Sequence, residues 1–203
     1  MTARPYHHGG LREALLERAL WEIDASGVER LSVRGLARDL GVSHGASARH
    51  FRDRATLLDA VAVEGFGQLL DAMRAGGGDE PLAAAARGYV RFAVDHPRLL
   101  AATFGAKHAR TPSEELLAAG ERAYDFVVEL LVRGQREGLV RSGDPRAQAR
   151  VTFAAVHGVA MLAVDDLLDG APWEQATDEI VGLLSAGLGS PSPRTAAPSA
   201  TRD

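Results

Sequence analysis

Apolar residues recur at helical spacing along nearly the whole chain. Near the N-terminus, Leu11, Leu15, Ala19 and Ile23 return every four residues, which places them on one face of an α-helix. Isoleucine, threonine and aromatic residues, which favour strands, are sparse, whereas alanine, leucine, arginine and glutamate are abundant. We therefore predict an all-α protein with nine helices, over residues 11–26, 33–40, 44–51, 53–74, 80–96, 98–104, 113–137, 146–168 and 173–188.

Capping residues mark several helix ends. A serine before a helix accepts a hydrogen bond from a first-turn backbone N–H, so Ser32 and Ser43 predict the starts of the second and third helices. Gly27 and Gly41 supply the left-handed conformation that ends the first and second helices. Residues 189–203 are rich in proline, serine, alanine and threonine, and we predict a disordered tail there.

The second and third helices have the pattern of a helix-turn-helix. Leu36, Ala37 and Leu40 line the inner face of a short helix, and Gly41 provides the positive φ of a tight turn. Phe51 then anchors the following helix to the core. This geometry frees one face of the second helix of the motif to lie in the major groove of DNA. An ordinary helical hairpin shares much of the pattern.

The distribution of charge favours the DNA-binding alternative. The whole chain has a net charge of -4, which argues mildly against a nucleic-acid partner. However, residues 30–54 carry six arginines against two aspartates, whereas residues 61–203 have a net charge of -5. A basic block on an acidic body is typical of a DNA-binding head. We predict a DNA-binding domain over residues 1–53 and a second, helical domain over residues 54–188.

Across residues 6–66 the chain resembles the TetR family of bacterial repressors. The resemblance is carried by the stretch 6–12, the block 31–44, the triplet 49–51 and the segment 54–58. In addition, residues 153–158 look like the signature of a C-terminal subfamily named for Trp, His and Gly, with Phe153 at the place of the Trp.

The resemblance implies roles for the residues of the head. Arg34 and His44 reach base edges, and Arg49 contacts either a base or a phosphate. Ser32, Ser43, His50 and Arg54 hold phosphates, Gly45 belongs to the same DNA-facing surface, and an N-terminal arm with Arg4 and Tyr6 touches the backbone or the minor groove.

Two positions of the third helix leave alternatives open. His50 can pack against the first helix instead of binding a phosphate. The family usually carries an aromatic residue where this chain has Ala48, so a phosphate and thymine-methyl contact is missing. We therefore expect the affinity for DNA to depend on the arginines and on dimerisation, with a steep salt dependence.

The eighth helix is apolar almost all round over residues 151–164, so it must be covered on every side. One side faces its own subunit, as in any core helix. By resemblance, this helix and the ninth pair with their copies in a four-helix bundle. The residues expected at this dimer interface are Val159, Trp173, Ile180, Leu183 and Leu184.

The fourth to eighth helices carry most of the larger side chains. In the TetR family such helices enclose a pocket for a small apolar or amphipathic ligand, although each of these residues taken alone is more often a core residue than a ligand contact. His157 can bind the ligand or form a hydrogen bond within the core. The candidate pocket residues are Phe66, Met73, Tyr89, Phe92, Phe104, Tyr124, His157 and Met161.

Other functional classes find little support in the sequence. Without cysteine the chain has no disulfide, thiolate zinc site or cysteine nucleophile. It has no glycine-rich phosphate loop and no paired carboxylates at catalytic spacing, and His7–His8 alone are too few ligands for a metal. We therefore predict no enzyme activity, cofactor or metal. Without a signal peptide or an apolar run of membrane-spanning length, we expect a cytoplasmic protein.

Together these observations predict a homodimeric regulator with two further partners, an operator in double-stranded DNA and a small-molecule effector. We expect a repressor that releases a palindromic operator when the effector binds. The alternative is a helical small-molecule-binding protein with a degenerate DNA head.

Overall fold

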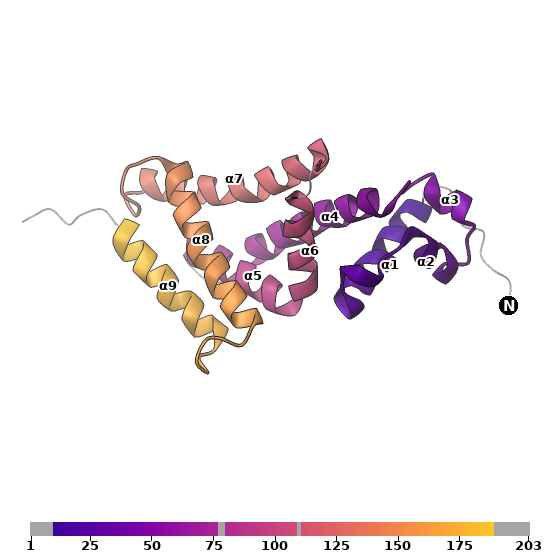
Figure 1. Cartoon of the computed structure of the whole chain (residues 1–203). Helices are drawn as coiled ribbons and strands as arrows, with labels where there is room; N and C mark the ends of the chain where they lie inside the picture. The colour runs from indigo at the N-terminus through magenta and orange to yellow at the C-terminus, as the bar shows by residue number, and fades with distance from the viewer. Residues whose placement is uncertain (1–9, 77–79, 109–110, 189–203) are drawn as a thin grey trace, which may run out of the picture.

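The structure of the chain, a computed structural model, describes residues 10–76, 80–108 and 111–188 (Figure 1). The described residues form nine α-helices and one 3-10 helix, and they contain no strand, which confirms the predicted all-α fold. The elements are α1 (Gly10–Ser26), η1 (Val28–Arg30), α2 (Val33–Asp39), α3 (His44–Ala48), α4 (Arg54–Ala75), α5 (Pro81–Asp95), α6 (Pro97–Lys107), α7 (Glu114–Arg136), α8 (Pro145–Val164) and α9 (Trp173–Leu188).

The first three α-helices and η1 form a small head (residues 10–53) at one end of the molecule (Figure 1). Its centre consists of Leu15, Ile23, Leu36 and Phe51, each with at most 1% of its surface exposed. Burying four large side chains in about forty residues stabilises the head by roughly 1.5–3 kcal/mol for each side chain. The inner positions predicted for the helix-turn-helix are therefore confirmed for Leu36 and Phe51.

The remaining helices, α4 to α9, form the body (Figure 1). The helix α4 leaves the head and packs against α5, α6 and α7, while α8 packs against α5, α7 and α9. Gly65 brings α4 close to α6, because a Cβ at this position would lie 2.1 Å from Thr103 Oγ1. Gly88 does the same for α4 and α5, with a Cβ position 2.1 Å from the carbonyl oxygen of Ala72. The apolar core continues from the head into the body along α4.

Three helix ends differ from the prediction by more than one residue. The helix α3 ends at Ala48 and not at Phe51, because residues 49–50 form a tighter turn in which His50 N–H donates to the carbonyl of Ser47, three residues back, at 3.0 Å. The helix α8 ends at Val164, because Asp166 adopts a positive φ of 56° that terminates it before residue 168. The helix α6 extends three residues further than predicted, to Lys107.

The structure describes the two predicted turn glycines but not the predicted tail or the N-terminal arm. Gly27 and Gly41 both have a positive φ, 79° and 67°, which favours glycine, although Gly27 has an extended ψ of 176° and not the left-handed helical value. The predicted tail over residues 189–203, and the arm with Arg4, Tyr6 and His7–His8, lie outside the described residues.

The faces of α8 correct one prediction. Among the described helices α8 alone is long and apolar enough to cross a membrane, although a core helix of a soluble protein passes the same test. Val159 was predicted at the dimer interface, but it is only 9% exposed and packs in the core of its own chain. The outward apolar side chains are instead Val151, 56% exposed, and Leu162, 43% exposed. Apolarity all round the helix could not tell these two faces apart.

Candidate nucleic-acid interface and ligand cavity

The helix-turn-helix is fixed by its two serine caps. Ser32 Oγ accepts a hydrogen bond from Gly35 N–H at 3.0 Å, and Ser43 Oγ accepts one from Ala46 N–H at 3.2 Å. Both predicted caps are confirmed. Both serines are exposed, and each hydroxyl keeps its own proton for a further acceptor, such as a phosphate oxygen.

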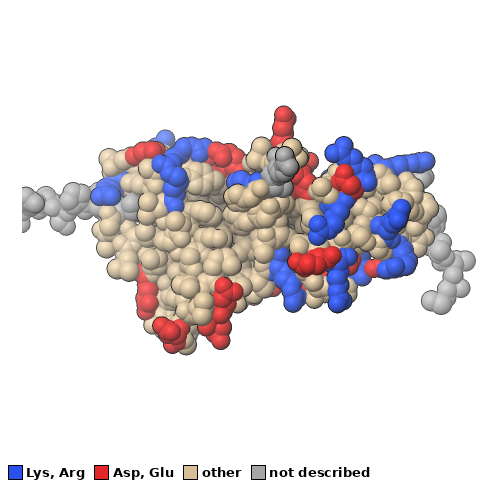
Figure 2. Space-filling view, in the orientation of Figure 1, with Lys and Arg blue, Asp and Glu red and all other residues tan. Residues whose placement is uncertain are grey.

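The exposed side chains of α2 and α3 form a basic surface. Arg34, His44, Gly45 and Arg49 are exposed, while His50 is half-buried. Figure 2 shows lysine and arginine side chains gathered over this head end of the molecule. Gly45 leaves the backbone of α3 open, because a Cβ there would meet no atom within 4 Å. This surface can approach a polyanion without first breaking an internal contact of Arg34 or Arg49, since neither has an ion pair among the described residues.

Arg54 differs from the role that the resemblance implies. Its Nε donates to the carbonyl of Leu31 at 3.2 Å, and one of its terminal nitrogens donates to the carbonyl of Val28 at 2.6 Å. These bonds tie the first residue of α4 to the segment around η1. The guanidinium therefore helps to hold the head together, a role that the resemblance does not imply.

The start of α4 is capped by Asp53. Its carboxylate accepts hydrogen bonds from Thr56 N–H and from Thr56 Oγ, both at 2.8 Å. These bonds, the backbone one above all, hold the pKa of Asp53 below its usual value, with a smaller effect of the neighbouring Arg52. The junction between the head and α4 is thus fixed on both sides of residue 53.

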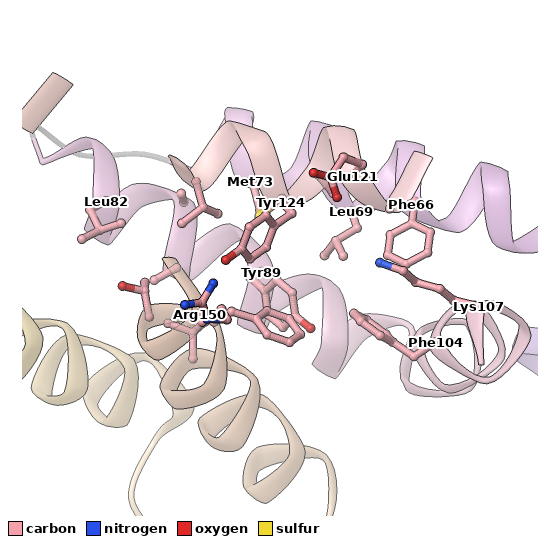
Figure 3. A pocket seen from close by; sticks show the side chains of 18 of the residues that line it. Phe66, Leu69, Met73, Leu82, Tyr89, Phe104, Lys107, Glu121, Tyr124 and Arg150 are labelled. Carbon is pink, nitrogen blue, oxygen red and sulfur yellow. The ribbon is translucent and has the colours of Figure 1, made fainter. Parts of the chain in front are cut away.

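A cavity of about 480 Å³ lies in the body, lined by residues of α4 to α8 (Figure 3). Five of the predicted pocket residues line it, namely Phe66, Met73, Tyr89, Phe104 and Tyr124. Pockets of this size and apolar character are typical of small-molecule binding sites.

Three predicted pocket residues do not line the cavity. Phe92 is 5% exposed and lies on the side of α5 that faces the ring of His96, with the ring centroids 5.4 Å apart. Met161 is half-buried and packs against the core. His157 lies behind the cavity wall, stacked on Phe153 with the ring centroids 5.3 Å apart. Helical periodicity placed all three on inward faces, but these faces contact other helices and not the cavity.

His157 forms a hydrogen bond within the core, one of the two alternatives left open by the sequence. Its Nδ1 lies 2.8 Å from Tyr89 Oη. Burial lowers the pKa of His157 and raises that of Tyr89, so both groups are neutral near pH 7. A neutral pair fits the apolar surroundings and orients the Tyr89 ring in the cavity wall.

Sequence reasoning missed the polar residues of the cavity, which include Lys107, Glu121, Arg150 and Thr152. Lys107 lies beyond the predicted end of its helix at residue 104, but in the structure it closes the last turn of α6 and reaches the cavity from there. Thr152 precedes Phe153 in a helix that looks apolar throughout, so nothing in its pattern marks it.

The predicted dimer residues of α9 fall into two groups. Trp173, Ile180 and Leu184 are half-buried and pack against their own body. Leu183 is 70% exposed. In a single chain, Leu183 is therefore the member of this set whose side chain is free to contact a second copy.

In addition to α4, hydrogen bonds of two side chains, His96 and Arg98, connect the body to the head. His96 Nδ1 lies 2.8 Å from Asp24 Oδ2, and Arg98 donates to the backbone carbonyls of Asp24 at 2.7 Å and of Ala25 at 2.9 Å. These bonds join the N-terminal end of α6 to the C-terminal end of α1. The same helix α6 lines the cavity with Phe104 and Lys107, so one rigid element contacts both regions.

Comparisons with known proteins identify the family. The family model described as tetracyclin repressor-like, C-terminal domain, matches residues 82–188, more than half of the chain. A protein of unknown function from Rhodococcus sp. RHA1 is 40% identical, with a TM-score of 0.83, and the match covers 93% of this chain and 100% of that one. No curated protein matches the chain significantly.

Two more distant structures share the fold. The TetR-family transcriptional regulator PfmR from Thermus thermophilus is 20% identical, with a TM-score of 0.63, over 87% of this chain and 99% of that one. AibR, solved in complex with isovaleryl coenzyme A and operator DNA, is 21% identical, with a TM-score of 0.59, over 85% of this chain and 96% of that one. The resemblance seen in residues 6–66 thus extends through the C-terminal half, and the chain belongs to the TetR family.

Proposed function

We propose that this protein is a dimeric transcription regulator that binds a palindromic operator and responds to a small molecule in its cavity. The observation that supports this most strongly is that α4 connects a basic helix-turn-helix to an apolar cavity of about 480 Å³. AibR has the same fold and was solved with both an acyl coenzyme A and operator DNA. We assign no catalytic activity to the chain.

In the head, we assign base contacts to Arg34 and His44, and base or phosphate contacts to Arg49. Ser32, Ser43 and His50 are assigned to phosphates. An arginine that binds a guanine through two hydrogen bonds discriminates against other bases by about 1–3 kcal/mol. Because Ala48 lacks the aromatic contact usual in the family, the arginines carry a larger share of the affinity.

We propose that α8 and α9 pair with their copies across the face that carries Val151, Leu162 and Leu183. These are large apolar side chains that one chain leaves exposed by 56%, 43% and 70%. A single head makes too few contacts for specific recognition, whereas two heads about 34 Å apart read the two halves of a palindrome. The dimer therefore sets the spacing of the heads.

The cavity and the heads are coupled through two helices. Along α4, the rise from Arg54 at the head to Phe66 at the cavity is about 18 Å at 1.5 Å for each residue. Along α6, Arg98 and His96 contact the head while Phe104 lines the cavity. A ligand that prefers one arrangement of these helices shifts the spacing of the heads and so changes operator affinity.

Selection of bound duplexes from a randomised pool by the full chain tests DNA recognition. We expect enrichment of a palindrome. On single-base variants of that palindrome, Arg34→Ala should lose discrimination at one base pair in each half-site, by about 5- to 150-fold. The exposed Arg122 of α7 provides the control, since Arg122→Ala removes the same charge from the body. Binding without sequence preference would favour the alternative, a small-molecule-binding protein with a degenerate head.

Sedimentation analysis tests the dimer. Leu183→Asp should yield monomers and weaken binding to the palindrome, because it places a charge in the proposed apolar interface. Leu139 is matched in exposure, 68% against 70%, but lies between α7 and α8, so Leu139→Asp should stay dimeric. A Leu183→Asp protein that remains a dimer would place the interface elsewhere.

A further inference from the structure

The cavity contains a cation, Lys107, that has no ion-pair partner among the described residues. Lys107 ends α6, is half-buried, and lines the cavity. Its Nζ lies 5.4 Å from the centroid of the Phe66 ring. Among the described residues, the ammonium has no carboxylate within 4.0 Å and no hydrogen-bond acceptor. The face of the Phe66 ring attracts the ammonium but carries no net opposite charge, so a half-buried ammonium still gains from a counter-charge.

The carboxylate of the cavity is already engaged. Glu121 forms an ion pair with Arg146, which also donates to Asp125 at 3.0 Å. These three residues join α7 to α8, so the carboxylate of Glu121 is paired with Arg146 and not with the ammonium of Lys107.

The neighbouring helix makes room for the ammonium. A Cβ at Gly120 of α7 would lie 2.7 Å from Lys107 Nζ and 3.0 Å from Lys107 Cε. Glycine at this position therefore allows the ammonium to lie against the backbone of α7, at the wall of the cavity. Any other residue at position 120 would displace Lys107 from this place.

A second polar group of the cavity also lacks a partner. Thr152 is 4% exposed, and its Oγ1 is buried without a hydrogen-bond partner among the described residues. Buried hydroxyls in native proteins nearly always have one. Thr152 lines the same cavity, but its Oγ1 is covered by other atoms of the chain, so a bound molecule reaches this hydroxyl only if the side chain turns toward the cavity.

We propose that the molecule bound in the cavity is an amphipathic monocarboxylate whose acidic group lies against Lys107. This rests on the proposed function, in which the cavity is the effector site. The rest of the lining is mainly apolar and aromatic, and it includes Phe66, Leu69 and Phe104 (Figure 3). At about 30 Å³ for a water-sized group, the cavity of about 480 Å³ holds roughly 16 such groups. This size fits a medium-chain or aryl-substituted carboxylic acid.

The test compares a carboxylate with an uncharged molecule of the same shape. Calorimetric titration of the full chain with 4-phenylbutanoate and with 4-phenylbutanamide measures both affinities, and decanoate with decanamide repeats the comparison for an alkyl body. We expect the acid of each pair to bind at least about tenfold more tightly, as a hydrogen bond to a charged group predicts. Lys107→Met should abolish this ratio and leave the affinity for the amide within about twofold.

Two further variants make the test specific. Arg150 lies at the opposite side of the cavity and is exposed, so Arg150→Met should leave the ratio unchanged (Figure 3). Gly120→Ala keeps every charge but displaces Lys107 Nζ, so it should reduce the ratio without loss of the fold. The proposal is overturned if neither acid binds, if acid and amide bind equally, or if Arg150→Met removes the ratio while Lys107→Met does not. Operator selection on the same preparation shows separately whether the proposed function holds.

Discussion

The contact between α4 and α6 can be tested with two identical substitutions two residues apart. Gly65 and Gly67 both lie within α4. A Cβ at Gly65 would lie 2.1 Å from Thr103 Oγ1, whereas a Cβ at Gly67 would meet no atom within 4 Å. Thr103 is fully buried and donates to the carbonyl of Leu99 at 2.8 Å, so it cannot turn aside without losing that bond.

The expected free energies have opposite signs. Replacing a mid-helix glycine with alanine gains about 0.5–1 kcal/mol from the backbone. Forcing an extra methyl into a packed interface costs about 1–3 kcal/mol. Gly65→Ala should therefore destabilise the fold by about 1–2 kcal/mol, whereas Gly67→Ala should stabilise it by about 0.5–1 kcal/mol.

Guanidinium denaturation at one fixed protein concentration measures both changes, because the stability of a dimer depends on concentration. In thermal denaturation, each kcal/mol shifts Tm by about 2–4 °C for a chain of this size. Thr103→Ala removes Oγ1 and should rescue Gly65→Ala in the double variant, with a coupling energy above about 0.5 kcal/mol. If Gly65→Ala is as stable as Gly67→Ala, then α4 and α6 do not approach as described.

Three further predictions concern single side chains. Thr152→Val replaces an unpaired buried hydroxyl with a methyl of similar size. It should therefore raise the free energy of unfolding by about 1–3 kcal/mol. A lower free energy of unfolding would show that the hydroxyl has a partner. Burial lowers the pKa of His157 in the folded chain. As the pH falls, His157 therefore becomes protonated in the unfolded chain before it does in the folded chain. The stability that depends on a neutral His157 is present above about pH 6.5 and is lost as the pH falls below that value. The free energy of unfolding should consequently decline less in His157→Phe than in the natural chain between about pH 7.5 and about pH 5.5, and equal slopes would contradict the shift. Arg54→Met should lower stability by about 1 kcal/mol, because two carbonyls lose a charged donor, whereas a residue that only contacts phosphate would weaken DNA binding without changing Tm.

Local chemistry explains what could be predicted from the sequence. The serine caps, the positive φ of Gly41 and the buried Phe51 depend on neighbours within a few residues, so the head follows from its own sequence. The cavity was expected from the resemblance to the TetR family, and the large side chains Phe66 and Phe104 do line it.

The errors come from contacts between distant segments. Val159 and Met161 lie on a helix that is apolar on every side, and only packing against α5, α7 and α9 decides which side faces inward. Arg54 resembles a phosphate contact until η1 brings two carbonyls to its guanidinium. Lys107 becomes a cavity residue only because α6 continues past its expected end.

The most direct test of the proposed regulator is an anisotropy titration of the selected palindrome and of its isolated half-site with the full chain at two salt concentrations. We predict two chains on each palindrome, an affinity at least about 100-fold higher than for the half-site, and a steep fall with salt that reflects the arginines of α2 and α3. Equal affinity for the palindrome, the half-site and an unrelated duplex would contradict a dimer that reads DNA through paired helix-turn-helix heads.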